Sequence, residues 1–173
     1  SLSQIPESAL FCCLEVGMNK KGEIKKLSEL IKPDLAIITA VEQSHLQGLK
    51  DLRNIALAKS EILYSLPKYG CFIFNKDTNF SQMLNDKAIK LKINNIISYG
   101  VSNSANIKLI NFKLNNNVYF IKANCFEKII EWEMPAIGEH WIHNSLSIIA
   151  AGIYYDLDMN SILAGLRSFK LPL

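Results

Sequence analysis

Four continuous apolar runs, separated by amphipathic stretches, constrain the fold of this chain most strongly. The runs cover residues 9–14, 35–41, 70–75 and 95–100. A run that is apolar at every position is typical of a strand buried on both faces, and the stretches between the runs have helical spacing. This β-α-β-α alternation predicts an α/β fold that is doubly wound, with a mostly parallel sheet over residues 10–99 and helices on both faces.

The pattern changes after Gly100. Residues 107–133 alternate apolar and polar side chains, with a turn of three asparagines at 115–117. Such alternation is typical of antiparallel strands that have one face in water. We therefore expect an antiparallel β extension of the sheet here, followed by helices over residues 140–155 and 160–169.

Composition places the chain among globular proteins and excludes several function classes. Its 173 residues are 49% hydrophobic and 20% charged, which is enough for one domain with a sizeable core. The net charge of +3 comes from 19 basic and 16 acidic residues, so it does not favour nucleic acid or an anionic membrane as a partner. No apolar run reaches the ~18 residues of a membrane span.

The four cysteines are Cys12, Cys13, Cys71 and Cys125, and none forms a Cys-x-x-Cys pair. This spacing argues against a zinc site, and we expect reduced cysteines in the core. A reducing cytoplasm is therefore the expected location.

Three chemically active side chains follow the apolar runs. Glu15 ends the first run, His45 lies just past the second, and Lys59 falls in the apolar stripe of a helix expected over residues 51–66. Ligands of open α/β sheets bind at the carboxyl ends of the strands, so these groups can meet in one crevice. The pattern predicts a site for a cation and an anionic ligand.

Each of these residues also has a structural interpretation. Glu15 is equally well explained as a carboxylate that caps the next turn. His45 alone is more often a loop or N-cap histidine than a metal ligand. Lys59 could extend its amine to the rim of the core, although a lysine within a core-facing stripe needs pairing or modification.

Several separated motifs resemble the central domain of the Mur ligases, in the order found in that family. They are Leu14-Glu15-Val16-Gly17-Met18-Asn19, Gly22-Glu23-Ile24, Pro33-Asp34, Ser44-His45-Leu46 and Ala58-Lys59-Ser60-Glu61. The resemblance implies ATP and Mg²⁺ as cofactors, with Glu15 and His45 as metal ligands. It also implies that Lys59 is the lysine that family members carboxylate with carbon dioxide, giving an anion that supports the metal.

A later segment, residues 137–146, resembles the Gly-x-His-Asn-x-x-Asn-x-Leu motif of the same family. Its asparagines lie near adenine in the family. Asn144 keeps the second of these positions, whereas Trp141 replaces the first, where an indole could stack on a purine instead. His140 is expected to be structural, and His143 has no counterpart in the motif.

The Glu-x-Gly-Met-Asn form is most similar to the members that join D-alanyl-D-alanine to UDP-N-acetylmuramoyl-tripeptide. The resemblance thus implies these two substrates as partners. The chain contains no Gly-Lys-Thr or Gly-Lys-Ser phosphate loop. We therefore expect residues 1–173 to be a single partial domain, without the phosphate-loop strand or the flanking ligase domains, and inactive alone.

Two alternatives to this interpretation stay open. One is another member of the superfamily, such as folylpolyglutamate synthase. The other is a non-catalytic remnant or interaction module from a split or truncated gene.

Overall fold

The structure is a computed structural model of the chain, and it describes residues 5–41, 51–135 and 138–170. The first elements are α1 (Glu23–Ile31), β1 (Leu35–Ile38), α3 (Leu52–Lys59), the 3-10 helix η2 (Ser60–Tyr64), β2 (Cys71–Asn75), α4 (Ser81–Lys90) and β3 (Asn95–Gly100). The later elements are β4 (Ile107–Asn115), β5 (Val118–Cys125), β6 (Lys128–Pro135), α5 (His140–Tyr154) and α6 (Met159–Arg167).

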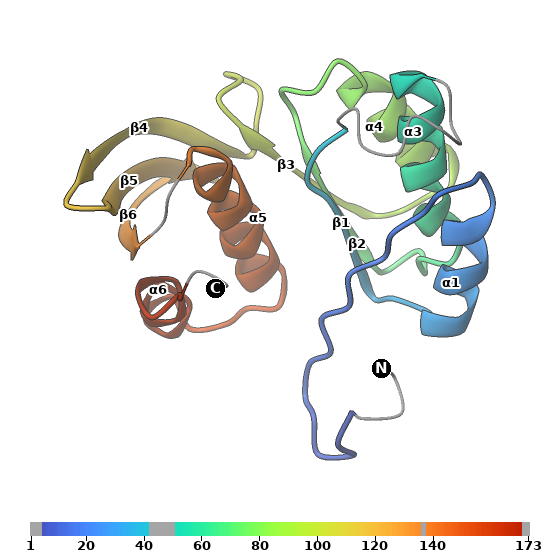
Figure 1. Cartoon of the computed structure of the whole chain (residues 1–173), viewed down its shortest axis with the longest axis horizontal. Coiled ribbons are helices and arrows are strands. Elements are labelled where there is room, and N and C mark those ends of the chain that lie inside the picture. Colours follow the sequence, from blue (N-terminus) through green and yellow to red (C-terminus); the bar gives the residue numbers. More distant parts are fainter. Residues whose placement is uncertain (1–4, 42–50, 136–137, 171–173) are drawn as a thin grey trace.

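One mixed sheet runs through the molecule with its strands in chain order, β1 to β6 (Figure 1). The strands β1, β2 and β3 are parallel, and β4 continues this parallel part through two residue pairs next to Tyr99 and Gly100. The pairs β4–β5 and β5–β6 are antiparallel. The predicted fold class, an α/β sheet with an antiparallel extension, is therefore confirmed.

Two hydrophobic clusters cover opposite faces of the sheet. On one face, α5 packs against the parallel strands and against the inner side of β4–β6, around Ile142, Leu146 and Ile149. On the other face, η2 and α4 pack on Phe72 and Phe74 of β2. Helices on both faces explain why the strands β2 and β3 are apolar at successive positions.

Tight turns connect the antiparallel strands. Asn116 and Asn117 link β4 to β5 with φ values of 48° and 61°, as the asparagine turn predicts. Phe126 and Glu127 link β5 to β6 with φ values of 48° and 69°. Positive φ at both central residues is the feature of the type I′ turn, whose twist matches that of the flanking strands.

The prediction of a buried first strand is wrong. Residues 9–14 form no strand, and the side chains of Leu10 and Phe11 are 90% and 57% exposed. A parallel strand exists only through hydrogen bonds to a neighbour distant in sequence. Within the described residues β1 pairs with β2 alone, and the apolar run 9–14 has no pairing partner.

Two of the four cysteines are buried in the core and two are exposed. Cys71 and Cys125 are free and buried in the core, as expected, and burial raises their pKa values to about 12 and about 11. Cys12 and Cys13 are also free but exposed, because they belong to the unpaired run. The expectation of a core position was wrong for this pair.

Candidate functional site

The carboxyl ends of β1, β2 and β3 lie together at one edge of the sheet, where the sequence places the site. The Tyr99 hydroxyl donates a hydrogen bond to the Thr39 carbonyl at 3.2 Å, which connects the ends of β3 and β1. The Lys76 amide donates to the Tyr99 carbonyl at 2.7 Å. Burial, together with the nearby Asp77 carboxylate, raises the pKa of Tyr99 well above its usual range, so the phenol stays neutral.

Asp77 holds the loop after β3 to the end of β2. Its carboxylate accepts hydrogen bonds from the Val101 amide at 2.7 Å and from the Ser102 amide at 3.0 Å. Gly100 has a φ of 145°, and a Cβ atom at that position would overlap the Asp77 carboxylate. Our sequence analysis missed this role, although a carboxylate just past the buried run 70–75 was a visible signal for it.

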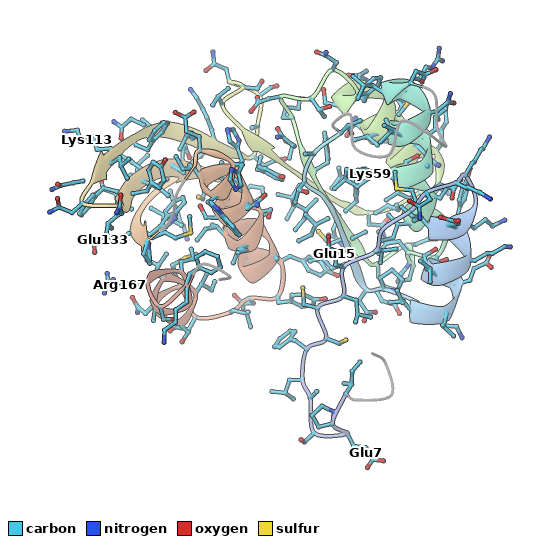
Figure 2. The ribbon with its side chains drawn as sticks, viewed as in Figure 1. Glu7, Glu15, Lys59, Lys113, Glu133 and Arg167 are labelled. Carbon is cyan, nitrogen blue, oxygen red and sulfur yellow. The ribbon has the colours of Figure 1, made fainter. Side chains whose placement is uncertain are left out.

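Glu15 lies on the extended segment that precedes α1, not at the end of a strand. Its side chain is exposed, and no hydrogen bond or ion pair engages it within the described part of the chain. In Figure 2, Glu15 and Lys59 lie in the half of the molecule that contains α1 and α3. The labelled Lys113, Glu133 and Arg167 lie in the other half.

Lys59 is half-buried and is the last residue of α3. The apolar stripe around it is confirmed, because every member is buried or half-buried: Leu52, Ile55, Ala56, Ile62, Leu63 and Leu66. The helix expected over residues 51–66 instead changes to 3-10 geometry at Ser60. Lys59 therefore stands at a junction between two helix types.

His45, the third predicted site residue, lies outside the described residues.

Glu61 is the second residue whose role our sequence analysis missed. A regular helix would place it on the surface, but its side chain is only 6% exposed. Both carboxylate oxygens lie 2.9 Å from the Gly22 amide, and Oε2 is 3.3 Å from the Lys25 amide. The change to 3-10 geometry rotates this residue inward, and helical periodicity gives no signal of that change.

The residues that resemble an adenine site lie on the first turns of α5. Trp141 is half-buried, and its ring centroid is 4.8 Å from that of Phe169. Asn144 is half-buried as well, and His143 has a buried Nδ1 without a hydrogen-bond partner in the described structure. Trp141 thus already has an aromatic neighbour in the protein itself, whereas the role of Asn144 stays a prediction.

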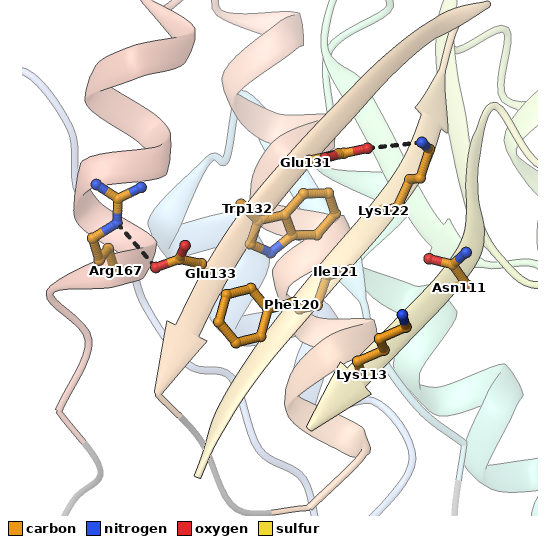
Figure 3. Close-up of a pocket in the computed structure, with 9 residues that line it drawn as sticks. All are labelled: Asn111, Lys113, Phe120, Ile121, Lys122, Glu131, Trp132, Glu133 and Arg167. Carbon is orange, nitrogen blue, oxygen red and sulfur yellow. Dashed lines mark ion pairs between the residues drawn. The ribbon is translucent and has the colours of Figure 1, made fainter. Parts of the chain in front are cut away.

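A shallow hollow of about 240 Å³ lies away from this edge, on the outer face of β4–β6 (Figure 3). Lys122 pairs with Glu131 at 2.7 Å, and Arg167 of α6 pairs with Glu133 at 3.8 Å. These ion pairs satisfy much of the charge within the hollow.

No group of three or more His, Cys, Asp or Glu residues is arranged to hold a metal in residues 5–41, 51–135 and 138–170. Within the same ranges, no helix is long and apolar enough to cross a membrane.

Comparison with known proteins identifies the family. The Mur ligase middle domain matches residues 1–152, which is most of the chain. The chain belongs to this family. A relative from Bacillus subtilis, UDP-N-acetylmuramoyl-tripeptide–D-alanyl-D-alanine ligase, is 32% identical over 167 residues, which are 96% of this chain and 35% of the relative. The chain spans about a third of the length of the curated relatives that it matches.

Solved structures of Mur ligases share the fold. A MurF from Acinetobacter baumannii superposes with a TM-score of 0.84 at 22% identity, over 92% of this chain and 34% of that one. A MurF from Thermotoga maritima, solved in complex with ADP, gives a TM-score of 0.75 at 15% identity, over 88% of this chain and 34% of that one. The predicted resemblance to the Mur ligase central domain is therefore confirmed.

Proposed function

We propose that this chain forms the greater part of the central ATPase domain of a UDP-N-acetylmuramoyl-tripeptide–D-alanyl-D-alanine ligase. The match of most of the chain to the Mur ligase middle domain carries this proposal. Curated relatives with that activity in their names, and the Glu15-Val16-Gly17-Met18-Asn19 string, favour this member over folylpolyglutamate synthase. The reaction would serve peptidoglycan precursor synthesis in the cytoplasm.

In the proposed reaction, ATP phosphorylates the terminal carboxylate of the tripeptide. The amine of D-alanyl-D-alanine then attacks the acyl phosphate, an amide bond forms, and phosphate leaves. Magnesium, when bound, neutralises negative charge on the transferring phosphoryl group. The chain's own contribution would be to present its ligand side chains from the segment before α1 and from the end of α3.

The side chains proposed as magnesium ligands have donor atoms of the suitable type. Mg²⁺ prefers oxygen ligands, and Glu15 offers an exposed carboxylate that no described residue engages. Lys59, as a carbamate, would add a second anionic oxygen donor from the end of α3. His45 is proposed as a further ligand on the basis of the family resemblance. Asn144 and Trp141 are proposed to lie beside adenine, with Trp141 held by Phe169.

Ligation by a chimeric enzyme tests this function. Residues 1–173 would replace the matching region of the Bacillus subtilis relative, which supplies the remaining two thirds of the polypeptide. We expect ATP-dependent joining of D-alanyl-D-alanine to UDP-N-acetylmuramoyl-tripeptide, measured by phosphate release and product mass. A folded chimera that hydrolyses or ligates nothing, beside an active parent enzyme, would contradict the proposal.

Residues 1–173 alone are expected to bind MgATP weakly or not at all. Backbone amides of a phosphate loop supply most phosphate contacts in such sites, and this sequence contains no such loop. Isothermal titration with MgATP measures the affinity directly. Sub-micromolar binding would show that the described edge of the sheet holds phosphates by other groups.

A further inference from the structure

Glu61 makes a contact that goes beyond the capping of a nearby helix. Its carboxylate meets the first turn of α1, where the N-cap residue Gly22 has no side chain to accept the unpaired amides. Carboxylates near a helix N-terminus satisfy these amides and interact favourably with the helix dipole. The acceptor here comes from 39 residues further along the chain, so the contact joins two separate elements.

Burial makes this contact rigid. A buried carboxylate is costly unless hydrogen bonds compensate for its lost hydration. Within the described residues Glu61 forms no ion pair, so amide donors from Gly22 and Lys25 provide the compensation. Moving the start of α1 away from η2 would leave the charge uncompensated, which favours a single geometry.

The two described metal-site candidates lie shortly before the two joined elements in sequence. Lys59 stands two residues before Glu61, and Glu15 stands seven residues before Gly22 on a segment without regular secondary structure. Val16 and Met18 of that segment pack into the same small cluster as Ile55 and Ala58 of α3. This cluster packs the Glu15 segment on the Lys59 helix, and the Glu61 carboxylate holds the start of α1, which follows that segment.

We propose that Glu61 is a positioning residue that holds the Glu15 segment in a fixed place relative to Lys59. The importance of these two side chains rests on the proposed function, whereas the tether itself can be tested without it. The same interface offers a matched control further along α1. There the Ser28 hydroxyl lies 2.9 Å from the Ser65 hydroxyl, so Ser28→Ala weakens α1 docking without touching Glu61.

Distance measurements between spin labels test the tether in the chain itself. Labels go at Gly17→Cys, which has open space around its Cβ position, and at Arg53→Cys, which is exposed on α3, after Cys12→Ser and Cys13→Ser. Cys71 and Cys125 are buried and stay unlabelled. We expect Glu61→Gln to broaden the distance distribution, while Ser28→Ala leaves it narrow. Equal distributions for both variants would overturn the proposal.

Amide hydrogen exchange gives a readout without labels. Glu61→Gln should speed exchange at Gly22 and Lys25 about tenfold or more, the factor that corresponds to a charged hydrogen bond. The exposed Glu29→Gln on the same helix makes the same charge change. Among the described residues its side chain faces only the Lys25 ammonium, at 3.9 Å, so it should leave both backbone amides unchanged. Unchanged exchange in Glu61→Gln would also overturn the tether.

The Mg²⁺ requirement of the chimeric ligase separates positioning from plain stability. Glu61→Gln should raise the Mg²⁺ concentration for half-maximal ligation, and Ser28→Ala should not. Equal Mg²⁺ requirements would reduce Glu61 to a structural cap and overturn the positioning role. If the unaltered chimera does not ligate, the proposed function fails, and the label distances and exchange rates still decide the tether.

Discussion

The molecule has a parallel region, formed by β1–β3 with α1, α3 and α4, and an antiparallel region, formed by β4–β6 with α5 and α6. The two regions differ in how far apart in sequence their paired strands lie. In the antiparallel region each strand pairs with its neighbour in sequence through a two-residue turn. In the parallel region the strands pair across 20 residues or more, and the apolar run 9–14 pairs with nothing described. Strand pairing in the second region is therefore local, whereas strand pairing in the first requires partners distant in sequence.

This difference separates much of the hydrophobic core from the metal-site candidates, whereas the adenine candidates Trp141 and Asn144 lie on α5. Glu15, Lys59 and Asp77 all lie in the parallel region, together with the long extended segment before α1. The antiparallel region contributes most of the larger hydrophobic cluster, including Trp132, Ile142 and Leu146. Substitutions in the two regions should therefore have different effects, and each of the following predictions tests that expectation.

The largest expected effect is on ligation by the Lys59→Ala chimera. A carbamate at Lys59 would attract magnesium, so its loss should nearly abolish turnover while the melting temperature stays close to that of the unaltered chimera. Added short carboxylic acids should restore part of the activity by occupying the vacated anion site. Turnover within a few fold of the unaltered chimera would refute the carbamate role.

Gly100→Ala should cause the largest loss of stability. A side chain is strained at a φ of 145° and would displace the Asp77 carboxylate that holds Val101 and Ser102. The expected cost is about 1–3 kcal/mol of the free energy of unfolding, measured by denaturant titration. Gly165→Ala is the matched control in α6, where the Cβ position is open, and it should gain about 0.5–1 kcal/mol. A neutral Gly100→Ala would show that the loop after β3 adapts freely.

Ser145→Ala tests the antiparallel region. The Trp132 indole N–H donates to the Ser145 hydroxyl at 3.2 Å, in a buried contact between β6 and α5. Removing the acceptor leaves a buried donor unpaired and should cost about 1–2 kcal/mol, with ligation by the chimera largely kept. Ser147→Ala removes a hydroxyl whose single hydrogen bond among the described residues goes to the Asn144 carbonyl, so it should cost less. Equal losses for the two variants would mean that the indole contact contributes nothing.

The sequence predicted the features that depend on local pattern, but not those that depend on a distant pairing partner. The asparagine turn, the strand alternation after Gly100 and the parallel runs from Leu35 onward were all readable, because each depends on local pattern. The run 9–14 carries an equally strong strand pattern, but its state depends on a partner that local pattern does not specify.

Within the candidate site, too, local spacing was predictable and long-range contacts were not. The stripe around Lys59 was predictable from helical spacing, and its burial is confirmed. The contact of Glu61 with Gly22 spans 39 residues and depends on a change of helix type, neither of which leaves a periodic signal. Within α1, helical spacing puts Leu27 and Leu30 on the same face as the buried Ile24. Both leucines are nevertheless exposed, because Ser28 takes the buried position and bonds to Ser65.

The smallest expected effect is a pH-dependent one at the start of α6. The Asp158 carboxylate accepts hydrogen bonds from the Ser161 hydroxyl at 2.8 Å and from the Ser161 amide at 2.9 Å, which lowers its pKa below the ordinary value. A lowered native pKa means that the ionised cap stabilises the fold above the ordinary pKa of about 4, and that this contribution is lost as pH falls through the native pKa.

Asp158→Ala should therefore lower the melting temperature slightly at pH 7, and the difference from the unaltered chain should vanish at strongly acidic pH. Asp158→Asn keeps an N-cap acceptor without the charge, so its melting temperature at pH 7 should lie between those of Asp158→Ala and the unaltered chain. Thermal melts of the three proteins across this pH range measure the effect. If the melting temperatures of Asp158→Ala and the unaltered chain differ as much at acidic pH as at pH 7, the ionised carboxylate is not what stabilises the start of α6.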